Sequence, residues 1–252
     1  MDLCLVSVFL LGLLSFNWSS EAAITAWTLP GPITGASGSI SATAIPENPV
    51  EGAVLFTAKA TTAVNYTLTG NAGGKGTINS TSGVVTLAKG QIIDFETTTS
   101  LQFLVVATDS TGSNGTANIT LPITNVNEAP AFSSATETAC IKDNSPAGTT
   151  LGTYIATDPD IGNTITYSIT SGNSNTDFDI SGKGVITVAT GKTLSKASTA
   201  TYILVVNATD SPSPHLNGST IVSVTVGDCS GAGMVTALMY LMFAVVVTTQ
   251  LL

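Results

Sequence analysis

The strongest constraint on the fold of this chain is an internal repeat with an offset of about 100 residues. Three pairs of segments share this offset: Leu101–Ala107 with Tyr202–Ala208, Tyr66–Thr69 with Tyr167–Thr170, and Thr77–Thr86 with Gly184–Thr187. A constant offset over several segments indicates a tandem repeat of one structural unit. The chain is therefore predicted to contain two copies of the same domain.

Each copy consists of short apolar stretches with turn residues between them. Leu101–Ala107 and Tyr202–Ala208 are rich in Val and Leu, as strands are, and neither copy has a long segment with helical periodicity. Several short strands in about 100 residues favour an antiparallel β-sandwich. The predicted fold class is all-β, with two sandwiches in tandem.

Charge and motif content exclude several functions. Only 9% of residues are charged, the formal net charge is −9, and the seven basic residues are all lysines without clustering. Nucleic-acid binding is not expected, because it requires grouped Lys and Arg. A Ser–His–Asp triad would need His215, the only histidine, and no Gly-x-Ser-x-Gly segment marks a nucleophile. The protein is predicted not to be an enzyme.

Both ends of the chain are apolar. Residues 1–22 are predicted to be a signal peptide, because Leu3–Leu14 is apolar but short for a membrane span. Residues 230–252 contain the uncharged stretch Met234–Leu252. Two interpretations are open for this segment: a glycolipid-anchor (GPI-anchor) signal, with Ser230-Gly231-Ala232 as its small residues, or a single membrane span. Either one predicts attachment to the membrane, at the extracellular face of the plasma membrane.

The segment between these ends has features of an exported glycoprotein. Six Asn-x-Ser/Thr motifs are candidate glycosylation sites: Asn65, Asn79, Asn114, Asn118, Asn207 and Asn217. Asn17 also matches but lies in the predicted signal peptide. Cys4 lies there too, which leaves Cys140 and Cys229. These two cysteines form either one disulfide, as is common in exported proteins, or two unpaired thiols.

Acidic residues occur in short motifs at corresponding places in the two copies. Ala-Thr-Asp ends the longest apolar stretch of each copy, at Asp109 and Asp210. The other motifs are Ile45-Pro46-Glu47-Asn48, Asp94-Phe95-Glu96, Asn125-Val126-Asn127-Glu128-Ala129-Pro130 and Asp158-Pro159-Asp160.

In this order and spacing, these motifs resemble those of cadherin repeats, and the resemblance covers most of residues 41–228. It implies two seven-stranded Greek-key β-sandwiches with an immunoglobulin-like architecture. The first repeat is expected over residues 41–128 and the second over residues 129–229. Residues 23–40 are expected to form an N-terminal extension.

In cadherins, calcium binds between neighbouring repeats, and the resemblance implies the same cofactor here. Calcium takes six to eight oxygen ligands, and grouped carboxylates repel one another without a cation. Carried over by matching position, the ligands are Glu47, Asp94, Glu96, Asn125, Asn127, Glu128, Asp158, Asp160 and Asp210, with Asn163 as a further oxygen donor.

Two stretches depart from the cadherin pattern. Lys59–Val64 has no acid where Asp-x-Asp would stand, and Leu194–Ala197 replaces Asp-x-Glu in the second copy. One calcium junction is therefore expected, between the two repeats. Asp109 is expected to stabilise a turn. Ordinary solvated turn positions are expected for Glu137, Asp143, Asp177 and Asp179.

The resemblance also bears on Cys140, Cys229 and Trp27. First and last strands are neighbours in such sandwiches, so Cys140 and Cys229 are expected to form a disulfide. Trp27 is expected to pack on its own domain or to lie in a flexible arm, and strand exchange with a partner is the less favoured alternative.

The function implied by the resemblance is calcium-dependent cell adhesion or cell-surface recognition, with calcium making the junction rigid. The expected partners are other cell-surface proteins, including a second copy of this chain. The alternative function is a calcium-binding spacer, or a matrix or surface-coat glycoprotein, without specific adhesion.

Overall fold

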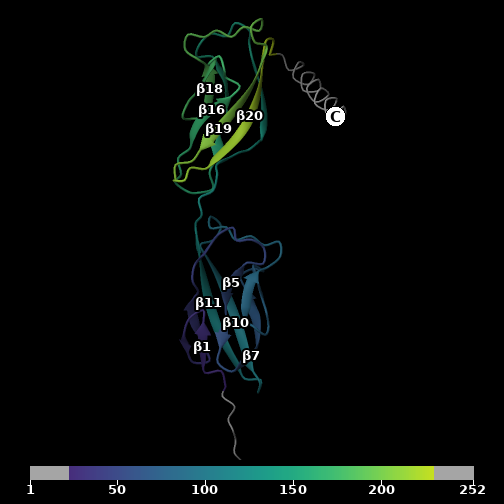
Figure 1. The fold of residues 1–252 in the computed structure, drawn as a ribbon, viewed down its shortest axis with the longest axis vertical. Coiled ribbons are helices and arrows are strands. Elements are labelled where there is room, and N and C mark those ends of the chain that lie inside the picture. Colours follow the sequence, from purple (N-terminus) through teal and green to yellow (C-terminus); the bar gives the residue numbers. More distant parts are fainter. Residues whose placement is uncertain (1–22, 230–252) are drawn as a thin grey trace, which may run out of the picture. The chain divides into compact units, whose positions relative to one another are not determined.

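In the computed structural model, residues 23–229 are described, and every regular element among them is a β-strand. The chain divides between Asn125 and Val126 into two compact units, which Figure 1 shows in purple to teal and in teal to yellow. The predicted signal peptide, the predicted anchor segment and Asn17 lie outside the described residues. Within residues 23–229, no helix has the length and apolar character needed to cross a membrane.

The first unit is built from short strands around three long ones. Its strands are β1 (Ala26–Leu29), β2 (Ile33–Thr34), β3 (Ser37–Ser41), β4 (Ile45–Pro46), β5 (Val54–Thr57), β6 (Lys59–Ala60), β7 (Ala63–Asn71), β8 (Gly76–Ile78), β9 (Val84–Leu87), β10 (Ser100–Asp109) and β11 (Asn114–Thr124).

These strands form sheets that enclose one apolar core. The main sheet has the order β3–β11–β10–β7, and β4 also pairs in parallel with β11. Facing strands form the sheets β5–β9–β8 and β2–β1–β6. Side chains of β10 alternate between inside and outside, so that Leu101, Phe103 and Val105 are buried while Gln102 and Leu104 face solvent. The alternation expected of a half-buried strand is thus present.

The second unit repeats this arrangement. Its strands are β12 (Ala131–Phe132), β13 (Thr136–Ile141), β14 (Thr150–Thr153), β15 (Ala156–Thr157), β16 (Thr166–Ser171), β17 (Phe178–Ile180), β18 (Val185–Val188), β19 (Thr201–Thr209) and β20 (Asn217–Val226). The main sheet has the order β13–β20–β19–β16, and β14–β18–β17 and β12–β15 complete the unit. Both units are Greek-key β-sandwiches, as the sequence predicts, with several strands broken into two segments.

Residues 23–40 contribute strands to the first unit. β1 pairs with β6 just as β12 pairs with β15 in the second unit, and the additional strand β2 folds back on β1. Trp27 pairs with Ala60 where Phe132 pairs with Ala156, so Trp27 and Phe132 hold equivalent places. Only 1% of Trp27 is exposed, and its indole N–H donates to the carbonyl oxygen of Ala36 at 3.0 Å. Trp27 therefore belongs to the core of its own unit.

A covalent bond joins the two ends of the second unit. Cys140 lies on β13 and Cys229 follows β20, and the two form a disulfide with their Cα atoms 5.5 Å apart. β13 runs parallel to β20, which brings Cys140 next to Thr225 near the end of that strand. Because the disulfide joins residues 89 positions apart, it encloses almost the whole second unit.

Candidate metal centre

Three predicted ligands meet in the first unit. Glu47 follows β4 directly, and Asp94 and Glu96 lie in the connection between β9 and β10. One oxygen from each carboxylate lies within 4.8 Å of the others, which is a spacing that one cation can bridge. Only 3% of Glu47 is exposed. The structure thus brings together acids that are far apart in the sequence.

Hydrogen bonds to the backbone hold these side chains in place. The Phe95 N–H donates to Glu47 Oε2 at 2.7 Å, which ties the end of β4 to the β9–β10 connection. Asp94 accepts bonds from the Thr97 hydroxyl at 2.8 Å and from the Thr97 N–H at 3.1 Å. The bond from the Thr97 hydroxyl is the main reason that the pKa of Asp94 lies below its ordinary value. Asp94 therefore stays ionised and able to bind a cation.

Hydrogen bonds link six predicted ligands in the second unit, and Glu128 takes part through its backbone N–H. They come from the segment before β12, from the β15–β16 connection and from the residue after β19: Asn127, Glu128, Asp158, Asp160, Asn163 and Asp210. Asn127 Nδ2 donates to Asp210 Oδ2 at 2.5 Å, and Asn163 Nδ2 donates to Asn127 Oδ1 at 3.2 Å. The first residues of the unit are thereby fixed to both loops.

The two most buried acids of this cluster are oriented by backbone N–H groups. Asp160 is 5% exposed and accepts a bond from the Glu128 N–H at 2.7 Å. Asp210 is 2% exposed and accepts a bond from the Leu216 N–H at 2.7 Å. A buried carboxylate is costly unless hydrogen bonds or a cation stabilise its charge. The cluster consists of carboxylate and amide oxygens, which is the donor set that calcium prefers.

Asp158 gives the clearest indication that this cluster suits a cation. Its Oδ1 accepts bonds from the Asp160 N–H at 3.0 Å and from Asn163 Nδ2 at 3.4 Å. Its Oδ2 is buried and has no hydrogen-bond partner. Buried polar atoms are nearly always paired, so an unpaired carboxylate oxygen among other oxygen donors fits a metal ligand.

The remaining predicted ligand, Asn125, directly follows β11 and is the last residue of the first unit. Asp109, expected to stabilise a turn, accepts bonds at Oδ1 from the Thr111 N–H, the Thr111 hydroxyl and the Ser113 N–H, at 2.7 to 2.9 Å. The hydroxyl of Thr111 makes the largest contribution to lowering the pKa of Asp109. Asp109 therefore organises the β10–β11 turn.

Sequence reasoning missed the role of Asp143. Asp143 Oδ1 accepts a bond from the Lys196 N–H at 2.8 Å, which is the same contact that Glu47 makes with Phe95. Asp143 is thus the counterpart of Glu47, rather than only a solvated turn residue. The matching segments Ile45-Pro46-Glu47-Asn48 and Ile141-Lys142-Asp143-Asn144 carried this signal. Ser195 and Ala197 stand where Asp94 and Glu96 would be, so the three-carboxylate cluster is not repeated there.

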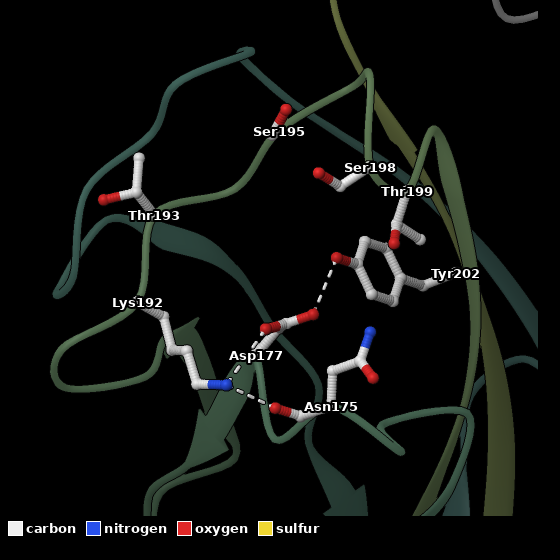
Figure 2. Close-up of a pocket in the computed structure, with 8 residues that line it drawn as sticks. All are labelled: Asn175, Asp177, Lys192, Thr193, Ser195, Ser198, Thr199 and Tyr202. Atoms are coloured by element: carbon white, nitrogen blue, oxygen red, sulfur yellow. Dashed lines mark hydrogen bonds and ion pairs between the residues drawn. The ribbon is translucent and has the colours of Figure 1, made fainter.

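A polar pocket of about 400 Å³ adjoins this part of the second unit. Figure 2 shows Asp177 between Tyr202 and Lys192: the Tyr202 hydroxyl donates to Asp177 Oδ2 at 2.9 Å, and Lys192 Nζ lies 3.5 Å from Oδ1. Lys192 Nζ also donates to the carbonyl oxygen of Asn175 at 2.5 Å. Burial, and next the bond to Asp177, raise the pKa of Tyr202. These groups stabilise one another, so the side chains that line the pocket have a structural role.

Comparison with known proteins agrees with this architecture. The family model of the cadherin domain matches residues 137–227. Similar curated proteins include the protocadherin-like wing polarity protein stan of Drosophila melanogaster, 33% identical over 168 residues, and human cadherin-23, 35% identical over 170 residues. These matches cover 64% and 66% of this chain but only 5% of each relative. The chain thus corresponds to a small part of those proteins.

Solved structures show the same fold. Drosophila N-cadherin EC1-4 is 28% identical with a TM-score of 0.54, and the match covers 77% of this chain and 48% of that one. Human protocadherin-24 EC1-2 (form II) has a TM-score of 0.56 at 22% identity, over 75% of this chain and 95% of that one. At that identity the second likeness concerns the fold alone.

The fold and the acid motifs together define a protein made of cadherin-type sandwiches. The chain belongs to the cadherin repeat family. This is a family of cell-adhesion and recognition proteins rather than of enzymes, and its domains bind calcium as a class.

Proposed function

We propose that this protein is a calcium-dependent cell-adhesion or cell-surface recognition protein, in which calcium makes the junction between its two repeats rigid. The observation that carries the proposal is a pair of oxygen-donor clusters, one in each unit. Glu47, Asp94 and Glu96 belong to the first cluster. The second is organised around Asp158, Asp160 and Asp210.

The donors themselves support a calcium-binding role. Glu47, Asp94, Glu96, Asn125, Asn127, Glu128, Asp158, Asp160, Asn163 and Asp210 would hold the ions. Calcium would supply positive charge that offsets the repulsion among these carboxylates. Asn127 and Glu128 lie just after the boundary between the units, next to Val126, and their bonds to Asp210 and Asp160 anchor that segment to the second unit. Ligation of the same segment would restrict its motion, and a stiff junction presents the first unit to a partner in one orientation.

The proposed partners are other cell-surface proteins, including a second copy of this chain. The proposed location is the extracellular face of the plasma membrane, with residues 230–252 as the tether. A calcium-binding spacer or surface-coat glycoprotein is the second candidate. Its support is the set of glycosylation motifs on the main sheets, where Asn118 lies on β11 and Asn207 on β19.

The first experiment is a thermal unfolding series on residues 23–229, which retains Cys229 and hence the disulfide. Wild type, Asp158→Asn and the matched control Asp179→Asn are compared in millimolar calcium and in chelator. Asp179 is an exposed acid on β17, away from the clusters in sequence. A ligand that binds only the folded state raises Tm by mass action.

We expect calcium to raise Tm for wild type and for Asp179→Asn, and to have a smaller effect on Asp158→Asn. Equal Tm values with and without calcium for wild type would refute calcium binding. Bead aggregation by the purified protein then separates the two functions. Aggregation in calcium but not in chelator supports adhesion, and dispersed beads in both conditions support the spacer.

A further inference from the structure

Three of the four candidate glycosylation sites of the first unit gather on one face of its main sheet. Asn114 and Asn118 lie on β11 with even spacing, so both project to the same side of that strand. Both are exposed, whereas the intervening Gly115 and Ala117 are buried. Asn65 lies on β7 and is exposed, while its neighbour Tyr66 is buried. All three asparagines therefore point outward.

Strand pairing puts these three asparagines close to one another, with β10 between β7 and β11 (Figure 1). Thr108 on β10 pairs with Asn114 on one side and with Asn65 on the other. Neighbouring strands are about 4.8 Å apart, which separates Asn65 from Asn114 by about 10 Å. Asn118 lies four residues from Asn114, or about 13 Å along the strand, opposite the exposed Leu104. A sugar chain at each position would meet its neighbours.

The same face carries no charge. Among residues 23–125, the charged residues that lie outside the metal cluster and the β10–β11 turn are Glu51, Lys59, Lys75 and Lys89. All four lie on or beside β5, β6, β8 and β9, which belong to the facing sheets. The outer face of β3–β11–β10–β7 instead presents Ser, Thr, Asn, Gln and Leu side chains. Soluble surfaces usually have about a quarter of their residues charged, so this face needs another source of solubility.

The second unit has the same arrangement. Asn207 on β19 and Asn217 on β20 both lie on the outer face of the main sheet, and Asn207 Nδ2 donates to Asn217 Oδ1 at 3.2 Å. The apolar residues Ile203 and Ile221 are exposed on the same face, at 52% and 39%. Only Asn79, in the turn between β8 and β9, belongs to a facing sheet. Acceptors thus lie on the uncharged face in both units.

We propose that N-linked glycans at Asn65, Asn114 and Asn118 form a joint cover over the outer face of the first unit's main sheet. In the transfer step, the Asn amide nitrogen displaces the lipid diphosphate of a lipid-linked oligosaccharide. A bond forms between Nδ2 and the anomeric carbon, the bond from that carbon to the diphosphate oxygen breaks, and the diphosphate leaves with the electron pair. One amide proton passes to a base. Protein contacts of the first unit are then restricted to its other surfaces.

Site occupancy is the first test. The full chain is expressed in a eukaryotic cell line, extracted from the cells and treated with peptide-N-glycosidase in heavy-oxygen water, which turns each glycosylated Asn into labelled Asp. We expect the label at Asn65, Asn114 and Asn118 in peptide mass spectra. Unlabelled asparagines at these three positions would overturn the proposal.

The cover itself is tested on folded protein in chelator, so that the result does not depend on calcium binding. An endoglycosidase trims the sugars of wild type, and self-association is followed by sedimentation velocity. The variant Asn65→Gln/Asn114→Gln/Asn118→Gln is compared with Asn79→Gln. We expect self-association to rise several-fold after trimming and in the triple variant, but not in Asn79→Gln. Identical sedimentation of trimmed and untrimmed protein would show that the sugars do not shield this face.

Discussion

The carboxylate of Glu47 accepts a hydrogen bond from the backbone N–H of Phe95 at 2.7 Å. This contact joins the segment after β4 to the β9–β10 connection, and it aligns Glu47 with Asp94 and Glu96. Its counterpart in the second unit joins Asp143 to Lys196 at 2.8 Å. The same hydrogen bond therefore serves a structural role in both units, whereas the metal-binding role of its carboxylate is proposed for the first unit only.

The two roles of Glu47 can be separated by substitution. Glu47→Gln keeps a carbonyl oxygen for the Phe95 N–H but removes the charge, so we expect nearly unchanged stability in chelator and a reduced gain in Tm with calcium. Glu47→Ala also removes a buried acceptor, which costs about 1–3 kcal/mol in chelator. Urea unfolding of residues 23–229 in chelator and in calcium measures both effects. A full calcium response in Glu47→Gln would contradict a ligand role.

The turn held by Asp109 predicts a pH-dependent contribution to stability. The pKa of Asp109 is lowered below its ordinary 3.8 in the folded state, chiefly by the Thr111 hydroxyl. Ionised Asp109 therefore stabilises the fold above the unfolded pKa, and this contribution is lost as the pH falls through the folded pKa.

Thr111→Val removes the hydroxyl and should raise the folded pKa of Asp109. We expect Tm to drop at neutral pH, and the difference from wild type to shrink as the solution is acidified below the folded pKa. Thermal melts across this pH range provide the measurement, and the same substitution in an Asp109→Asn background is the control. A difference that stays constant with pH would mean that Thr111 acts only through packing.

The disulfide predicts that the two units differ in their response to reduction. Closing a loop of about 90 residues stabilises a fold by about 4–5 kcal/mol in the chain-entropy model, and the Cys140–Cys229 bond has a sequence separation of 89. Cys140→Ser/Cys229→Ser should lower the free energy of unfolding of the second unit by an amount of this order. Guanidinium unfolding followed by amide hydrogen exchange resolves the two units. Equal losses in both units would argue against this assignment.

Because Trp27 is buried, we predict that strand β1, which carries it, is needed for the stability of the first unit. Trp27→Ala removes a fully buried side chain and its bond to Ala36, and such substitutions cost about 3–5 kcal/mol. Trp27 is the single tryptophan in residues 23–229, so the fluorescence of wild type reports its burial directly. A fluorescence spectrum typical of exposed indole, or a loss below about 1 kcal/mol, would place Trp27 outside the core.

Much of this protein could be read from local features of the sequence. Alternating apolar residues in segments such as Leu101–Ala107 depend on the two-residue period of a strand, and the repeat offset identifies two copies. Because the oxygen donors occur in short motifs, their chemistry is also visible along the chain. Asp158 and Asp160 could be named as candidate ligands in this way.

Other properties were decided only by the tertiary structure, because they depend on which distant segments pair and in what register. The sequence by itself does not show that Trp27 fills the place of Phe132. The gathering of Asn65 and Asn114 on one face follows from their pairing with the two sides of Thr108. A shift of one residue in either pairing would turn the side chains of that strand to the opposite face. Residue chemistry and periodicity are properties of the chain, whereas sites shared by distant strands arise from strand register.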